Sequence, residues 1–326
     1  MVLVLSRSDI EKVLTMKETI LVLEQAFREL TSGTAQMPPR ASLSIPGEGW
    51  LGAMPAYLGG LGSLSTKVVT MHERNASKGL PTVRATIVLN DPATGEALAF
   101  MEGSLVTAYR TGALGGLAAK HLSRKGSKVV GIFGAGIQAR TQLAALAEVR
   151  KLERVKVYDP VSERAGAFAD EMGRKTGLAV EVSPSSSDAV LGSDIVVTAT
   201  TSKVPLFDGG LVAPGTHLNA FGSFRPDQRE VDRKTVEESR VIVDSREAAL
   251  AEAGDLIIPI KEGKISADHI IAELGEVVSG TKIGRRSEAE ITLFKSVGLG
   301  IQDCAAAWLA YTKAKENGVG TELELG

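Results

Sequence analysis

The sequence predicts an α/β protein in which a doubly wound parallel sheet is joined to an α+β domain with a mainly antiparallel sheet. Two observations indicate this fold class. From residue 128 onward, short apolar runs alternate with helix-like stretches, which is the pattern of a parallel sheet with covering helices. Between Met37 and Phe100 the apolar runs are short and separated by Gly and Pro, which is typical of antiparallel strands joined by turns. At 326 residues the chain is long enough for two domains.

The first part of the chain is expected to open with two helices. Ser8 and Glu11 have the spacing of a capping box, and so do Thr15 and Glu18, so a helix is predicted to follow each pair. Apolar residues then recur at helical spacing at Ile20, Leu23, Phe27 and Leu30. Strands are expected over residues 67–70, 85–89 and 97–100, with a turn at 91–95 before the last.

The second part begins with an Ala/Gly/Leu-rich helix over residues 107–122 and an apolar run at 128–133 that is typical of a buried parallel strand. Later strands are expected to end near Tyr158, Thr200, Phe221 and Asp244. Residues 292–298 are expected to form a loop before a closing helix from Ile301 to about Lys315. The predicted domains are residues 1–115, completed by residues 302–326, and residues 116–301.

A glycine-rich turn, Gly134-Ala135-Gly136-Ile137-Gln138-Ala139, follows the strand at 128–133 and precedes an Ala/Leu-rich helix. Glycines lack a Cβ, so the backbone can turn sharply and approach a pyrophosphate, whose charge then faces the amides of the helix N-terminus. Asp159 closes the next apolar run, at about the spacing where a carboxylate accepts hydrogen bonds from a ribose. The combination predicts a Rossmann dinucleotide site.

The same aspartate indicates which dinucleotide is bound. Asp159 would repel a 2′-phosphate, which favours NAD(H). Ser162 and Arg164 follow shortly after it and could soften this preference, so NADP(H) remains possible.

Composition excludes several other kinds of partner. A net charge of −2 gives no electrostatic reason to expect nucleic acid or an anionic membrane surface. No apolar run reaches the roughly 20 residues that span a bilayer. The four histidines are scattered without ligand spacing, so no metal site is expected. The single cysteine, Cys304, excludes internal disulfides and fits a reducing cytoplasm, where we expect this protein to be located.

Three cations, Arg40, Lys67 and Arg110, lie beside small or apolar residues with few carboxylates nearby in the sequence. Arg40 follows the stiff stretch Met37-Pro38-Pro39, Lys67 begins an apolar strand, and Arg110 lies within the Ala/Gly-rich helix. Each could be a surface charge or part of a structural salt bridge. A substrate carboxylate is the alternative partner, because the planar guanidinium of arginine binds a carboxylate through two hydrogen bonds.

Five stretches of the sequence resemble the ornithine cyclodeaminase/mu-crystallin family. They are Met37-Pro38-Pro39-Arg40, Gly79-Leu80-Pro81-Thr82-Val83, Thr107-x-x-Arg110-Thr111-Gly112-Ala113, the turn from Gly134 to Ala139, and Ala272-Glu273-Leu274-Gly275-Glu276-Val277. The resemblance extends over nearly the whole chain. It implies a homodimer built through the first domain, with the C-terminal helix returning to that domain, a cofactor on the second domain and a small substrate between the two domains.

The resemblance also implies roles for individual residues. Arg40, Lys67 and Arg110 would hold the substrate, and Lys67 and Arg110 would take part in catalysis. Together with the glycine turn, it gives the expected cofactor residues: Thr82, Arg110, Gly134, Gly136, Ile137, Gln138, Asp159, Thr200, Ala220, Phe221 and Ser296.

One departure from the family pattern favours a particular reaction. The cyclodeaminase and alanine dehydrogenase members usually carry an aspartate where this chain has Phe224, and Gly-Lys where it has Asp227-Gln228. This stretch looks more like mu-crystallin and the pyrroline-2-carboxylate reductases. Cyclodeamination and oxidative deamination need a placed base, and phenylalanine cannot act as one. Reduction of a preformed C=N bond needs only a hydride and one proton, which Lys67 could supply.

The expected function is therefore NAD(P)H-dependent reduction of a cyclic imino acid, pyrroline-2-carboxylate or piperideine-2-carboxylate, to L-proline or L-pipecolate. Ornithine cyclodeaminase or alanine dehydrogenase is the alternative, with Asp227 or Asp303 in place of the missing aspartate, although Asp303 also suits a helix N-cap. A further alternative is a non-catalytic NAD(P)-dependent binder of small molecules.

Overall fold

The computed structural model describes residues 1–324, and the chain divides into two compact units. The first unit consists of Met1–Thr111 and the chain from Leu299 onward, and the second unit is Gly112–Gly298. The division falls within the helix α3 (Gly103–Leu122). No helix among the described residues is long and apolar enough to cross a membrane.

The first unit is built on a mixed sheet with the strand order β16-β1-β7-β6-β5-β4-β2, and β3 pairs with β4 outside this path. All neighbours are antiparallel except β1 and β7, which are parallel, so the predicted α+β domain with a mainly antiparallel sheet is confirmed. The strands are β1 (Val2–Leu5), β2 (Ala35–Gln36), β3 (Ala41–Ile45), β4 (Gly49–Leu58), β5 (Ser63–Met71), β6 (Val83–Asn90), β7 (Ala97–Glu102) and β16 (Thr321–Leu323).

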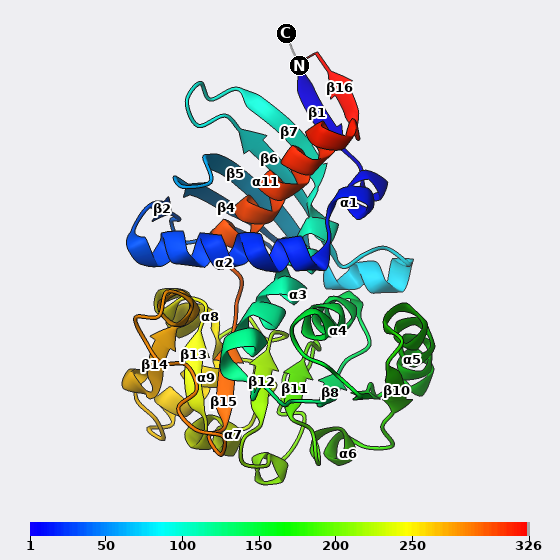
Figure 1. The fold of residues 1–326 in the computed structure, drawn as a ribbon, viewed down its shortest axis with the longest axis vertical. Helices are drawn as coiled ribbons and strands as arrows, with labels where there is room; N and C mark the ends of the chain where they lie inside the picture. Colours follow the sequence, from blue (N-terminus) through cyan, green and yellow to red (C-terminus); the bar gives the residue numbers. More distant parts are fainter. Residues whose placement is uncertain (325–326) are drawn as a thin grey trace. The chain divides into compact units, whose positions relative to one another are not determined.

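Helices cover one face of this sheet. They are α1 (Arg7–Val13), α2 (Met16–Ser32) and α11 (Gly300–Asn317), and a 3₁₀ helix, η1 (Glu73–Lys78), precedes β6. Figure 1 shows α11 beside α2, crossing β4 and β5. Side chains of alternate residues point to this face, as in Met54, Ala56 and Leu58 of β4, and are buried there.

Both N-terminal helices begin with a Ser or Thr cap three residues before an acid, as predicted, but α1 begins earlier than predicted. Thr15 caps α2 as expected, because its hydroxyl accepts a hydrogen bond from the Glu18 amide at 3.2 Å. The prediction of Ser8 as the other cap is wrong. Ser6 caps α1, and its capping box is completed by Asp9, whose side chain accepts from the Ser6 amide at 3.1 Å. Both serines stand three residues before an acid, so the sequence spacing alone fits either as the cap.

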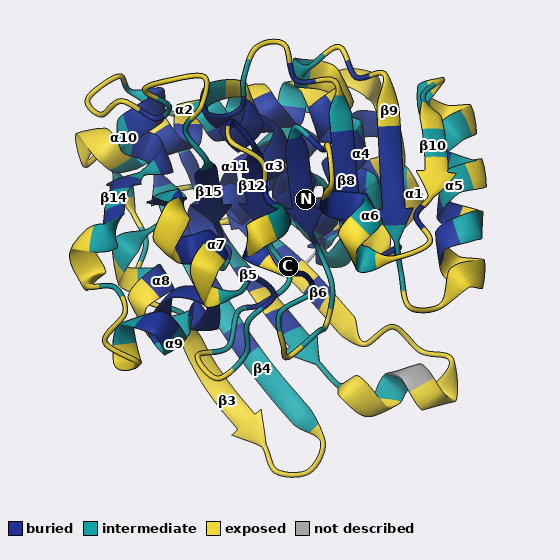
Figure 2. Cartoon of the chain, turned by 90° about the horizontal axis from the view of Figure 1, so that it is seen from below, coloured by how far each residue is buried: buried dark blue, intermediate teal, exposed yellow. Residues whose placement is uncertain are grey.

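The opposite face of the same sheet carries apolar side chains that residues 1–324 cover only in part. Val68 is 37% exposed; of its two cross-strand partners, Ala53 on β4 is half-buried and Thr86 on β6 is exposed. We call this surface the open face of the sheet; it comprises Tyr57, Leu64, Val68, Val88 and Phe100. Figure 2 also shows β3 exposed along its whole length.

The second unit contains a parallel sheet with the strand order β10-β9-β8-β11-β12-β15-β13-β14. Every neighbouring pair is parallel, and the order reverses between β8 and β11, so the predicted doubly wound sheet is confirmed. The strands are β8 (Val129–Phe133), β9 (Arg154–Tyr158), β10 (Ala179–Val182), β11 (Ile195–Thr198), β12 (His217–Ala220), β13 (Arg240–Val243), β14 (Ile270–Glu273) and β15 (Thr292–Lys295).

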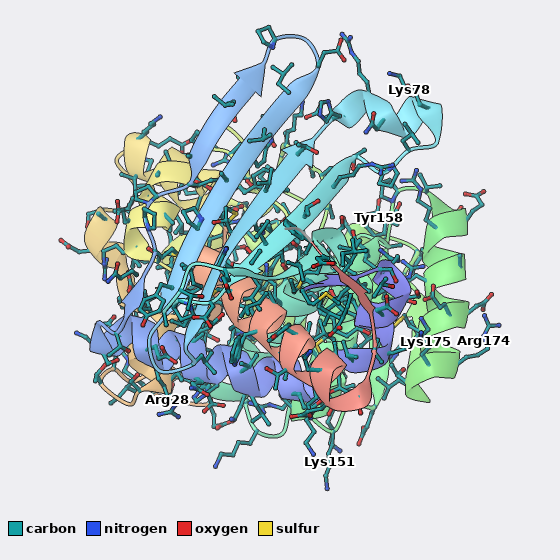
Figure 3. The ribbon with its side chains drawn as sticks, turned by 90° about the horizontal axis from the view of Figure 1, so that it is seen from above. Arg28, Lys78, Lys151, Tyr158, Arg174 and Lys175 are labelled. Atoms are coloured by element: carbon teal, nitrogen blue, oxygen red, sulfur yellow. The ribbon has the colours of Figure 1, made fainter. Side chains whose placement is uncertain are left out.

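Helices of the second unit lie on both sides of its sheet. They are α4 (Ile137–Val149), α5 (Ser162–Thr176), α6 (Ser186–Val190), α7 (Arg233–Glu238), α8 (Arg246–Glu252), α9 (Gly254–Lys261) and α10 (Leu274–Val278), with the 3₁₀ helices η2 (Gly209–Leu211) and η3 (Ala267–His269). Figure 3 shows Arg174 and Lys175 extending outward from the last turn of α5, where positive charge interacts favourably with the terminal carbonyls.

The strand β15 corrects the expectation of a loop at residues 292–298. Residues Thr292–Lys295 lie between β12 and β13, and all four are buried. Lys295 makes this run look like a polar boundary in the sequence. In the fold its charge is neutralised by Asp255, whose Oδ2 lies 2.7 Å from the Lys295 Nζ, so the strand can pass through the interior.

Candidate active site

The glycine turn leaves β8 at the point where the order of the parallel sheet reverses. Gly134 has a φ of +92°, and a Cβ there would lie 2.7 Å from the carbonyl oxygen of Ala199, so two independent constraints require glycine. Gly136 is the N-cap of α4, and a Cβ built on it meets no atom within 4 Å. Among the described residues no side chain caps α4, so its first amides can face an anion, with Ile137 and Gln138 in the same turn.

Asp159 lies beside this turn at the carboxyl end of β9. Its Oδ2 accepts a hydrogen bond from the Ala135 amide at 3.0 Å, and its Oδ1 accepts from the Val161 amide at 2.9 Å. Both oxygens are therefore oriented by the backbone, and their remaining lone pairs can accept from ribose hydroxyls. These residues fit the pyrophosphate and the adenosine ribose of a dinucleotide.

Arg140, which sequence reasoning missed, stabilises the turn from the other side. Its guanidinium donates to the carbonyl oxygens of Ala135 and Gly136, the latter at 3.2 Å, and its Nε donates to Glu171 at 2.8 Å. The side chain joins the turn to α5.

A buried glutamate, Glu230, joins the ends of β11 and β12. Its Oε1 accepts from both the amide and the hydroxyl of Thr200 at 2.7 Å, and its Oε2 accepts from the Thr198 hydroxyl and the Gly222 amide at 2.8 Å. Burial raises the pKa of Glu230, but donors surround both oxygens, and this arrangement fits the ionised form. The expected cofactor residues Thr200 and Phe221 thus lie in segments fixed by one carboxylate.

Behind Glu230 lies a second buried pair, Lys295 and Asp255. Besides the ion pair, Lys295 donates to the Ser223 carbonyl oxygen at 2.5 Å, and Asp255 accepts from the backbone amides of Glu230 and Val231 at 2.7 and 3.0 Å. We refer to Glu230, Asp255 and Lys295 as the buried network. Sequence reasoning missed it; the available signal was Asp255 and Lys295, each a charged residue next to apolar ones, whereas Glu230 lies in a charged stretch that gives no such signal.

The remaining expected cofactor residues have different settings. The Ser296 hydroxyl donates to Asp244 at 2.7 Å, so a ligand could use its lone pairs. The Phe221 ring packs on Phe294 with ring centroids 5.8 Å apart, and Ala220 is fully buried in β12. Thr82 belongs to the first unit, in an exposed segment between η1 and β6.

In the first unit, two of the predicted substrate residues meet on one carboxylate. The Lys67 Nζ lies 2.6 Å from Asp303 Oδ2, and the Arg110 Nε donates to Asp303 Oδ1 at 2.9 Å. The Arg110 Nη1 donates to Gln302 Oε1 at 2.5 Å. These side chains come from β5, α3 and α11 and are nearly or fully buried. The carboxylate that the local sequence lacked is thus supplied by α11.

Asp303 was considered above either as a helix N-cap or as a replacement for the aspartate that is missing at Phe224, and its position in the fold tests the first of these. The interpretation as an N-cap is wrong, because Leu299 is the N-cap of α11 and Asp303 lies inside the helix. Asp227 is exposed in the second unit, and Phe224 is half-buried.

Burial and charge set the protonation of this cluster. Burial lowers the pKa of Lys67 to about 7, although Asp303 raises it, and Arg110 and Arg40 lower it further. Burial would raise the pKa of Asp303, but the positive charges of Arg110 and Lys67 outweigh burial and hold that pKa below its ordinary value. Two cations therefore share one anion, and the cluster has an excess of positive charge.

Arg40 is half-buried and immediately precedes β3. Its guanidinium carbon lies 5.9 Å from the ring centroid of Trp50, at cation–π distance. Its charge acts on Lys67 as described above. The structure thus gathers Lys67 and Arg110 at Asp303, with Arg40 within electrostatic reach. Within residues 1–324 no group of three or more His, Cys, Asp or Glu side chains is suited to hold a metal ion.

Comparisons with known proteins show which family the chain belongs to. The model of the ornithine cyclodeaminase/mu-crystallin family matches residues 1–318. The Delta(1)-pyrroline-2-carboxylate reductase of Bacillus cereus is 41% identical over 324 residues, which covers 99% of each chain.

Two solved structures are similar over the full length. The Delta(1)-pyrroline-2-carboxylate reductase of Thermococcus litoralis, in complex with NADH and L-proline, is 50% identical with a TM-score of 0.97, covering 98% of this chain and 100% of its own. An archaeal alanine dehydrogenase dimer with bound NAD is 38% identical with a TM-score of 0.95, covering 100% of this chain and 99% of its own. The resemblance predicted from the sequence is confirmed: this chain belongs to the ornithine cyclodeaminase/mu-crystallin family.

Proposed function

We propose that this chain is an NAD(P)H-dependent reductase of cyclic 2-imino acids, with NADH preferred. It would convert pyrroline-2-carboxylate to L-proline, or the six-membered piperideine-2-carboxylate to L-pipecolate. The observation that carries the proposal is the cluster of Lys67 and Arg110 on Asp303, whose excess positive charge suits a small carboxylate. The Bacillus cereus and Thermococcus litoralis relatives are reductases of this kind, and the latter structure contains NADH and L-proline.

The two units have separate tasks in this proposal. The second unit binds the dinucleotide through the glycine turn, Asp159 and the segments held by Glu230. The first unit binds the substrate through Arg40, Lys67 and Arg110 and also forms the dimer.

Arg110 holds the substrate carboxylate. Its Nε and Nη1 are bound to Asp303 and Gln302, which fixes the guanidinium plane and leaves Nη2 for the ligand. Arg40 contributes a second positive charge. Since both side chains are held before binding, little ordering is needed when the substrate arrives.

Lys67 supplies the proton. A reduced nicotinamide cofactor, held by the glycine turn and Asp159, would supply the hydride for reduction of the C=N bond. Lys67 donates a proton from its ammonium group to the imine nitrogen, so that the C=N bond becomes a C–N bond and the product is a secondary amine. A pKa of about 7 suits this role, because a general acid works best when its pKa is close to the working pH. An imine that arrives already protonated needs Lys67 only as a hydrogen-bond partner.

The alternative reactions, cyclodeamination and oxidative deamination, need a base. Phe224 cannot provide one, and Asp227 is exposed. Asp303 is bound to two cations, which lower its pKa and make it a weak base. These observations favour imine reduction over both alternatives.

The test is a substrate panel with the purified protein. NADH consumption is measured with each cyclic imino acid and with pyruvate plus ammonia, and ammonia release is measured with NAD and ornithine or alanine. We expect rapid NADH consumption with a cyclic imino acid, abolished in Lys67→Met. Lys151→Met, which changes an exposed lysine labelled in Figure 3, is the matched control and should keep wild-type activity.

Other outcomes would point elsewhere. Faster ammonia release than imine reduction would show a deaminase. NADH binding without turnover of any substrate would show a non-catalytic binder.

The open face of the sheet in the first unit supports a homodimer. A monomeric chain rarely exposes a large apolar surface, and the apolar side chains of this face, among them the exposed Val68 and the half-buried Tyr57 and Leu64, are only partly covered. A second copy covering this face would bury it. Light scattering should give about twice the 34.2 kDa of one chain, and Val68→Asp should yield monomers. A monomeric wild-type protein would contradict the proposal.

We also propose that the protein is cytoplasmic. Its single cysteine, Cys304, is buried in α11, and burial raises the pKa of the thiol, which keeps it unreactive. Cell fractionation with an antibody would test the location; recovery in a membrane or secreted fraction would contradict it.

A further inference from the structure

We propose that Asp303 is the positioning residue of the substrate site, whose two carboxylate oxygens hold Lys67 and Arg110 in register and keep Lys67 in its ammonium form. This inference rests on the proposed function, because it assigns to Asp303 the control of the group that protonates the imine. In this role Asp303 does not act as the base that cyclodeamination or oxidative deamination would need.

The two carboxylate oxygens of Asp303 bind different cations. Oδ2 lies 2.6 Å from the Lys67 Nζ, and Oδ1 accepts from the Arg110 Nε at 2.9 Å. One carboxylate therefore fixes the distance between a proton donor on β5 and a carboxylate-binding arginine on α3. Neither cation could be held this way by a residue of its own element.

Gln302, the neighbour of Asp303, completes this arrangement. Its Oε1 accepts from the Arg110 Nη1, so two consecutive residues of α11 hold two nitrogens of one guanidinium. The guanidinium plane is then fixed by α11 rather than by the substrate, and the substrate meets an arginine that is already oriented.

The charges around Lys67 give Asp303 its second effect. Burial lowers the pKa of Lys67, and the cations facing it, Arg110 from α3 and Arg40 beside β3, lower it further. Asp303 is the group that raises it. Cys304 on the same helix stays neutral near pH 7, because burial raises the pKa of its thiol. Without Asp303, nothing among these groups favours the ammonium form of Lys67.

The variant Asp303→Asn removes the charge with almost no change of volume. We expect kcat for imine reduction to fall by about 100-fold, because Lys67 becomes neutral and Arg110 loses an anchor. The activity of the wild type should decline as pH rises through the pKa of Lys67. In Asp303→Asn this alkaline decline should move to lower pH by about one unit or more. The affinity for NADH, measured by fluorescence, should stay at the wild-type value.

Asp303→Glu keeps the charge and displaces it by one methylene. We expect a reduced kcat with an alkaline decline close to that of the wild type, which separates charge from position. Glu29→Gln is the matched control: Glu29 is a buried carboxylate of the same unit that accepts from the Gly60 amide at 2.8 Å, and its loss should leave the pH profile unchanged.

The experiment separates failure of this inference from failure of the proposed function. If the wild type reduces no cyclic imino acid, the proposed function is wrong. If the wild type is active and Asp303→Asn lowers kcat without moving the alkaline decline, Asp303 is merely structural. If Asp303→Asn does not fold, Asp303→Glu provides the test. An alkaline decline of activity that moves to lower pH in this variant, despite the retained charge, would overturn the proposal.

Discussion

Lys67 and Asp303 form an ion pair of 2.6 Å in which neither side chain is more than 2% exposed. Removing two charges from water is costly, and a buried ion pair often contributes less stability than apolar residues of the same volume. The pair belongs to a cluster with a second cation, Arg110, so two cations share the single carboxylate of Asp303. Such an arrangement is reasonable where an anionic ligand completes it.

Loss of the arginine in this cluster should affect turnover and not cofactor binding. For Arg110→Ala we expect kcat/KM for the imino acid to fall by about 100-fold or more, since a buried charged hydrogen-bond partner is removed. The Kd for NADH, from fluorescence titration, should change little. Arg28→Ala, which changes an exposed arginine of α2 labelled in Figure 3, is the control. Wild-type kcat/KM in Arg110→Ala would refute the carboxylate-binding role.

Replacing the carboxylate at the end of β9 should change the choice of cofactor. Asp159→Ser removes the charge that repels a 2′-phosphate and keeps a side chain that can bind the ribose. The ratio of kcat/KM with NADPH to that with NADH should rise by about 10-fold, whereas Asp170→Ser, an exposed change on α5, should leave it unaltered. An unchanged ratio in Asp159→Ser would remove Asp159 from the ribose site.

The buried network should matter for cofactor affinity. The carboxylate of Glu230 accepts hydrogen bonds from Thr198, Thr200 and Gly222. In Glu230→Gln the new NH₂ group must face at least one of these donors. A buried donor without an acceptor costs about 1–3 kcal/mol, so we expect the Kd for NADH to rise by about 10-fold. Titration of Glu238→Gln, an exposed change on α7, provides the comparison. Equal affinities of the two variants would contradict a role in cofactor binding.

His217 should make the protein sensitive to acid. Burial, together with Arg285, lowers the pKa of His217 to about 3 in the folded chain, against an ordinary value of about 6.5. Between these values the unfolded chain binds a proton that the folded chain does not. Stability is therefore lost as pH falls from about 6.5 towards 3, by an amount of order 4 kcal/mol from this group alone.

The measurement is urea unfolding of the wild type and His217→Gln. The variant should be less stable near neutral pH, since His217 bonds Asn219 and Thr292 at 3.0 and 2.9 Å. The difference in the free energy of unfolding should narrow towards about pH 4, because glutamine does not titrate. A difference that stays constant over this range would show that His217 does not titrate on unfolding.

Local patterns in the sequence predicted the strand, glycine turn and helix at β8 and α4. A strand, a turn with two glycines, a helix and an aspartate follow one another within a short stretch, and each is set by nearby residues. Gly134 is an example: its positive φ and its close approach to Ala199 both require glycine. This structural requirement can therefore be recognised in the sequence from the residue type alone. The predicted first capping box was wrong by two residues, because Ser6 and Ser8 each stand three residues before an acid and local spacing does not distinguish them.

The sequence by itself determined the α/β class, the doubly wound sheet, the dinucleotide turn and the family, because these depend on short-range periodicity and on residue types at fixed spacing. Only the tertiary structure decided which charges are paired. Lys295 passes through the sheet as part of β15 because Asp255 meets it, and Lys67 and Arg110 meet at Asp303 because α11 returns to the first unit. Ion pairs between residues far apart in the sequence leave no periodic pattern, so they become visible only when the fold brings the partners together.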